Sequence, residues 1–183
     1  LLTTTTGYEN TAVGKSALLD NTTGDSNVAI GKFTLSSNTT GRFNTAIGST
    51  ALQINTTGIY NTAVGGNSMF SATGSHNTAV GLNSLYKATG DYNTAIGEFA
   101  ANKNTTGEGI TAIGNDALKE NISANNVTGV GYKALMNNTT GADNTAVGYS
   151  ALSLNTTGYS NTAVGNEALK NNSTGFNNIA MGF

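Results

Sequence analysis

The segment NTAVGYSALSLNTTGYS, residues 144–160, is followed directly by NTAVGNEALKNNSTGFN, residues 161–177. The two segments have equal length and share Asn-Thr-Ala-Val-Gly, Ala-Leu and Thr-Gly at matching positions, so each is one copy of a repeated unit. Related copies begin at Asn10, Asn27, Asn44, Asn61, Asn77, Asn93, Ile110, Val127 and Asn178. These are 17-residue units, except for the 16-residue units that begin at Asn61 and Asn77. Residues 1–183 therefore form a single repeat-array domain of about eleven units.

Two glycine columns run through the aligned units. The first follows Val or Ile and includes Gly14, Gly31, Gly48, Gly65, Gly81, Gly97, Gly114, Gly131, Gly148 and Gly165. The second ends the Asn-Thr-Thr-Gly motif and is replaced only at Ala124. Glycine permits a positive φ or a close backbone approach, so each unit is predicted to contain two bends.

The short segments between these bends suit β-strands. Thr11-Ala12-Val13 is expected to form one strand, and the stretch around Ala17-Leu18 a second. Strand alternation separates the Val/Ile column from the Ala column. The Val/Ile column, from Val13 onward, and the Leu column, from Leu18 onward, are predicted to form the core.

A single unit is too small to fold alone. Ordering its backbone costs about 1–2 kcal/mol per residue, whereas its two large apolar side chains each return roughly 1.5–3 kcal/mol. The fold class predicted is therefore all-β, a parallel β-roll or β-solenoid in which each unit is one coil. Asparagines of the Asn-Thr-Thr-Gly bend, such as Asn21 and Asn38, would form an amide ladder. The composition alone would also suit a disordered tract, but disorder gives no reason for apolar columns that recur at a fixed period.

The motif Asn27-Val28-Ala29-Ile30-Gly31 resembles the head repeat of trimeric autotransporter adhesins, and the likeness extends over nearly the whole chain. That resemblance implies a left-handed β-roll, a homotrimer and projection from a bacterial surface toward a host protein or glycan. Similar arrays occur in phage or viral tail fibres. The implied location is extracellular, on a cell surface or a virion tail, and the chain is expected to be a segment of a longer fibrous protein.

The Ala column is open to two interpretations. Its small side chains would let one face pack closely against another wall, which favours self-association. They would equally fit inside a narrow turn of a monomeric roll.

The composition argues against catalysis and metal binding by this chain, and against nucleic-acid binding and membrane insertion. There is no Cys, His76 is the only histidine, and the ten acidic residues share no column, so no catalytic residue, metal site or cofactor is predicted. His76 is expected to be an exposed bend residue. The net charge of −2 and the scattered lysines provide no basic stripe for nucleic acid. No apolar run reaches the roughly 20 residues that a membrane span requires.

Recognition is expected at variable positions beside the bends, where aromatic residues recur. The candidates are Phe43, Tyr60, Tyr92, Tyr132, Tyr149, Tyr159 and Phe176. Such rings could stack on sugars or anchor a partner, or they could pack on the adjacent coil. The function predicted is a non-catalytic extracellular fibre or adhesin head, with a tail-fibre shaft as one alternative.

Three further features leave alternatives open. The threonine columns raise ice binding as a second alternative function. Sequons such as the one at Asn55 coincide with the predicted amide ladder, so a structural role competes with glycosylation. The 16-residue units and the irregular stretch 108–129 could mark a bend, a cap, a binding feature or drift.

Overall fold

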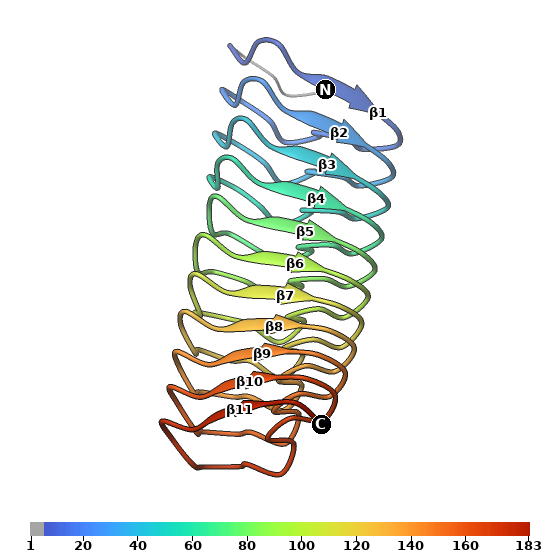
Figure 1. The fold of residues 1–183 in the computed structure, drawn as a ribbon. Coiled ribbons are helices and arrows are strands. Elements are labelled where there is room, and N and C mark those ends of the chain that lie inside the picture. Colours follow the sequence, from blue (N-terminus) through green and yellow to red (C-terminus); the bar gives the residue numbers. More distant parts are fainter. Residues whose placement is uncertain (1–5) are drawn as a thin grey trace.

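The computed structural model describes residues 6–183 as one elongated stack of coils (Figure 1). Each coil contributes one short strand to a single parallel sheet, and the strand order follows the chain from β1 to β11. The strands are β1 (Thr11–Val13), β2 (Val28–Ile30), β3 (Thr45–Ile47), β4 (Thr62–Val64), β5 (Thr78–Val80), β6 (Thr94–Ile96), β7 (Thr111–Ile113), β8 (Thr128–Val130), β9 (Thr145–Val147), β10 (Thr162–Val164) and β11 (Ile179–Met181). The predicted parallel β-solenoid is confirmed.

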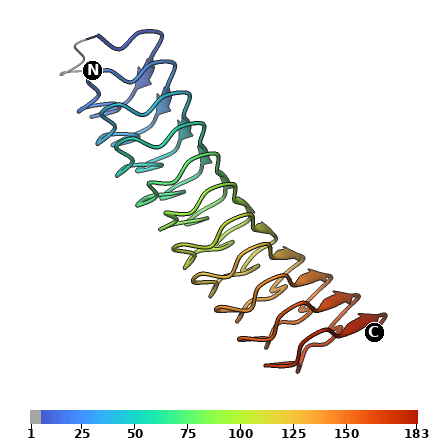
Figure 2. The ribbon, with the colours of Figure 1, turned by 90° about the vertical axis from the view of Figure 1, so that its left-hand side faces the viewer.

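Equivalent residues lie in register along the stack. Ala46 of β3 pairs with Ala63 of β4, and Ala79 of β5 pairs with Ala95 of β6. Seen from the side, the coils follow one another as nearly identical levels, and the sheet runs along the whole stack (Figure 2). The 16-residue units keep this strand register, so their missing residue is absorbed in the other half of the coil.

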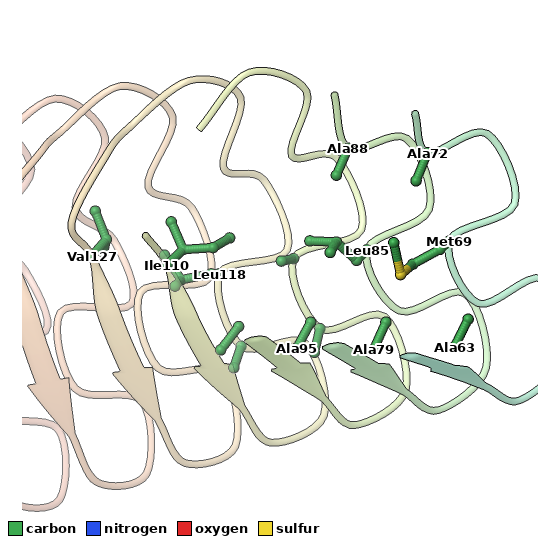
Figure 3. Close-up of a cluster of buried hydrophobic side chains, with 14 of the residues drawn as sticks. Ala63, Met69, Ala72, Ala79, Leu85, Ala88, Ala95, Ile110, Leu118 and Val127 are labelled. Atoms are coloured by element: carbon green, nitrogen blue, oxygen red, sulfur yellow. The ribbon is translucent and has the colours of Figure 1, made fainter. Parts of the chain in front are cut away.

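The Ala column, and not the Val/Ile column, faces the interior. Ala29, Ala46 and their equivalents from β2 to β10 are fully buried, with Gly129 at this position in β8. The Leu column is also buried, and Figure 3 shows Met69 and Leu85 between the strand alanines and Ala72 and Ala88. The prediction that Val and Ile form the core was therefore wrong. The Leu column fills most of the narrow interior, so the small Ala side chains fit opposite it and the larger Val and Ile side chains point outward.

The second half of the coil is not a strand, contrary to the prediction for Ala17-Leu18. This half is a run of turns in which Ser16 and Leu18 have φ of 58° and 49°. The same left-handed conformation recurs in the following coils. Backbone bonds to the next coil persist, as from Leu18 N to Thr34 O at 3.1 Å. Turns bonded to the next coil thus occupy the place where a second strand was expected.

The two glycine columns serve different purposes. Gly48, in the first column, has φ of +134°, which side-chain-bearing residues rarely adopt. Gly41, in the second column, has no such φ, but a Cβ there would lie 2.6 Å from Gly58 O of the next coil. The first column is thus required by its positive φ and the second by the close approach of the next coil's backbone. Both agree with the prediction of two glycine bends in each unit.

Two asparagine ladders hold the bends together. In the Asn-Thr-Thr-Gly bend, Asn38 donates to Asn21 Oδ1 at 2.8 Å, and Asn155 donates to Asn138 Oδ1 at 2.8 Å. Before the strands, Asn44 N donates to Asn27 Oδ1 at 3.0 Å. The predicted amide ladder is confirmed. Because these side chains are buried, the sequon asparagines of the ladder, such as Asn55, are enclosed in the folded chain.

We expect Asn138→Ala to lower the free energy of unfolding by about 1–3 kcal/mol, the cost of leaving buried polar partners unpaired. The Asn138 amide donates to Asn121 Oδ1 at 3.2 Å and to Gly141 O at 3.0 Å. Urea denaturation at a fixed protein concentration would measure the change. The control is Asn166→Ala, at an exposed position, and equal stability of the two variants would contradict the ladder's role.

Candidate functional surfaces

The outer face of the sheet carries a continuous row of aliphatic side chains, which we call the aliphatic face. Its members are Val13, Ile30, Ile47, Val64, Val80, Ile96, Ile113, Val130, Val147, Val164 and Met181, all exposed or half-buried. Threonines of the same strands, such as Thr45 and Thr62, lie in a parallel row. A contiguous apolar surface of this extent is unusual on an isolated soluble chain and is typical of an interaction site.

The aromatic candidates gather into stacks on the bends beside the sheet. Phe43 stacks on Tyr60 at 4.9 Å between ring centroids, and His76 lies between Tyr60 and Tyr92, at 5.1 and 5.0 Å. These four rings form one aromatic ladder before strands β3 to β6. Its rings remain partly open to solvent, with 65% of Tyr92 exposed. Packing on adjacent coils thus accounts for their alignment and leaves their edges accessible.

The remaining candidates form two separate pairs. Tyr159 stacks on Phe176 at 5.0 Å, and Tyr132 stacks on Tyr149 at 5.5 Å on the bend that follows the strands. The Lys133 ammonium lies 5.0 Å from the Tyr132 ring centroid. Its pKa is raised, first by the hydrogen bond with Tyr132. The seven predicted aromatics therefore occupy three places and form no single site.

Two features of the surface were not predicted from the sequence. His76 was expected to be only an exposed bend residue, although it shares a column with Phe43, Tyr60 and Tyr92, and that column would have predicted the stack. A cleft elsewhere on the stack holds about 600 Å³ and is lined by Asn83, Tyr86, Lys87, Phe99, Asn102, Lys103, Thr105 and Ile122. The only feature of the sequence that marks the position of this cleft is the change from a 16-residue unit to a 17-residue unit at Asn93.

Within residues 6–183, no group of three or more His, Asp or Glu side chains is placed to hold a metal ion. Over the same range, no helix is long and apolar enough to cross a membrane. No protein-family model, curated protein or solved structure matches this chain. The resemblance to adhesin heads therefore stays a prediction from the residue pattern.

Proposed function

We propose that this chain is a non-catalytic head or shaft segment of an extracellular fibre, self-associated through its aliphatic face and exposing its other walls for attachment. The aliphatic face carries the proposal. Eleven strands about 4.8 Å apart make this row roughly 50 Å long. Covering it with identical rows removes apolar area from water along the entire stack.

A homotrimer is the assembly that the resemblance to adhesin heads favours. Residues 6–183 of each chain form one sheet, and three such faces directed at a common axis would enclose the aliphatic rows. The aromatic ladder and the cleft lie outside the sheet strands, so they would remain on accessible walls. Attachment by repeated weak contacts along such a rod would gain affinity through multivalency.

Replacing two neighbouring members of the aliphatic face with lysine is expected to dissociate the assembly. Ile96 and Ile113 lie side by side on β6 and β7, with exposures of 39% and 36% in the single chain. In Ile96→Lys/Ile113→Lys, an assembled trimer would bury like charges near its axis, at a cost of several kcal/mol. Sedimentation equilibrium should show a trimer of 18.5 kDa chains for the wild type and a monomer for the variant.

The matched control is Ile54→Lys/Leu154→Lys, because these side chains have similar exposures of 40% and 43% but lie outside the sheet. This control should keep the trimer mass. A monomeric wild type would contradict self-association, and dissociation of both double variants would show that the aliphatic face is not the interface.

Ice binding is a second candidate, favoured by one observation. Thr and Val or Ile point outward from the same short strand in most coils, so hydroxyl and methyl groups form two regular rows. The two functions would compete for this face. A monomer with thermal hysteresis, lost in Ile96→Lys/Ile113→Lys, would favour ice binding; a trimer without thermal hysteresis would favour the fibre.

A further inference from the structure

The cleft lies where the coil length changes. Residues 77–92 form a 16-residue unit, and residues 93–109 form a 17-residue unit. Backbone bonds join Leu85 N to Ala100 O at 2.9 Å and Thr89 N to Thr105 O at 2.6 Å. Among residues 6–183, however, Lys87 N lacks the bond that its equivalent Glu120 N makes to Met136 O. Neighbouring bends of unequal length cannot form every backbone hydrogen bond between the two coils. We call the cleft at this mismatch the seam cleft.

An aromatic ring is held in place at the seam cleft. Tyr86 stacks on Phe70 of the preceding coil at 5.1 Å, with the ring planes 7° apart. The next coil has Asn102 in the corresponding column, so the stack ends at Tyr86, which lines the cleft. Such a fixed, flat apolar surface suits the C–H face of a pyranose ring.

The seam cleft is also locally cationic. Among residues 6–183, two lysines and no carboxylate line it, although the chain has a net charge of −2. Lys103 is paired with Glu120 at 2.6 Å. Within residues 6–183, Lys87 has no ion pair. Lys87 and Tyr86 both line the cleft, which therefore contains an ammonium group without an ion pair and an aromatic ring.

Two amide side chains complete the polar lining. Asn83 accepts a bond from Asn67 at 3.1 Å through its side-chain oxygen, which leaves its NH₂ group as a donor. Asn102 donates to the Asn83 backbone oxygen at 2.9 Å, which leaves its side-chain oxygen as an acceptor. A donor and an acceptor beside a ring suit sugar hydroxyl groups. The volume of about 600 Å³ lies within the range of small-ligand sites.

We propose that the seam cleft binds a carboxylated pyranose of an acidic glycan. Lys87 pairs with the carboxylate, Tyr86 packs against the ring, and the amides of Asn83 and Asn102 bond to hydroxyl groups. This inference rests on the proposed attachment function and names its ligand class. An acidic peptide would satisfy Lys87 but would leave the Tyr86 face and the amide pair unused.

The test is calorimetric titration of the assembled protein with sialyllactose and trigalacturonate, which carry the carboxylate on different sugars. Lactose and galactotriose are the neutral counterparts. At least one carboxylated probe should bind more tightly than its neutral counterpart. Lys87→Ala and Tyr86→Ala should each weaken binding by roughly tenfold, the scale of one charged hydrogen bond or a lost ring contact. Lys87→Arg should retain most of the affinity, because it keeps the charge.

Lys15→Ala and Tyr8→Ala are the matched controls, one an exposed lysine and the other an exposed ring, both near the start of the stack and outside the cleft lining. Both should bind like the wild type. The inference is overturned if neither carboxylated probe binds, if neutral probes bind equally well, if the controls lose as much affinity, or if an acidic peptide competes at equal concentration. The trimer mass is measured separately, so an intact trimer that binds no glycan would overturn this inference alone.

Discussion

Gly97→Ala is expected to lower the free energy of unfolding by about 2–6 kcal/mol, the sum of a conformational cost and a steric cost. Gly97 follows β6 with φ of +132°, and holding a side-chain-bearing residue there costs about 1–3 kcal/mol. The new Cβ would also lie 2.5 Å from Gly114 O and 2.6 Å from Gly114 C. Backbone atoms of the next coil must move to relieve this clash, which adds roughly 1–3 kcal/mol. Urea denaturation followed by circular dichroism would measure the loss.

Gly66→Ala is the matched control in the same array. A Cβ at Gly66 meets only Leu82 Cδ1, at 3.3 Å, and that atom ends a flexible, exposed side chain. The change should stay within about 0.5 kcal/mol, as for most surface substitutions. If Gly97→Ala were as stable as Gly66→Ala, the first glycine column would not be the conformational requirement that the structure assigns to it.

Leu118→Ala is expected to cost about 2–5 kcal/mol of unfolding free energy, the range for truncating a large buried aliphatic side chain. Leu118 is fully buried, and its Cγ would lie 3.2 Å from a Cβ built on Gly129 of β8. Ile110 and Val127 are buried in the same cluster, but surrounding side chains relax only partly into the void that such a truncation leaves. The midpoint of urea denaturation should fall accordingly at equal protein concentration.

Leu82→Ala provides the control, because Leu82 is 45% exposed on a bend. Its loss of stability should be no more than about 0.5 kcal/mol. Ala101 occupies the Leu column in the preceding coil, which shows that the array contains one natural truncation. Should Leu118→Ala cost no more than Leu82→Ala, the Leu column could not be the main apolar contribution to the core.

The sequence repeat by itself determined that each unit forms one coil and that the coils stack. A regular period with two glycine columns leaves stacking as the way to bury apolar side chains, and it predicted the parallel register that pairs Ala46 with Ala63. The Asn ladder could also be predicted from the sequence, since asparagines at the same position of every unit lie next to one another in adjacent coils. The stacking of His76 could have been predicted in the same way, because the residues at its position in the adjacent units are Tyr60 and Tyr92.

Only the tertiary structure decided which side of the strand faces inward. Alternation separates Ala46 from Ile47 but does not say which of them is buried, and the larger residue was chosen wrongly. Leu52 and its equivalents are buried opposite the strands, and the small Ala46 side chain, not Ile47, is buried with them. The seam cleft likewise needed three dimensions, because Tyr86, Lys87 and Asn102 meet only after coils of unequal length are stacked.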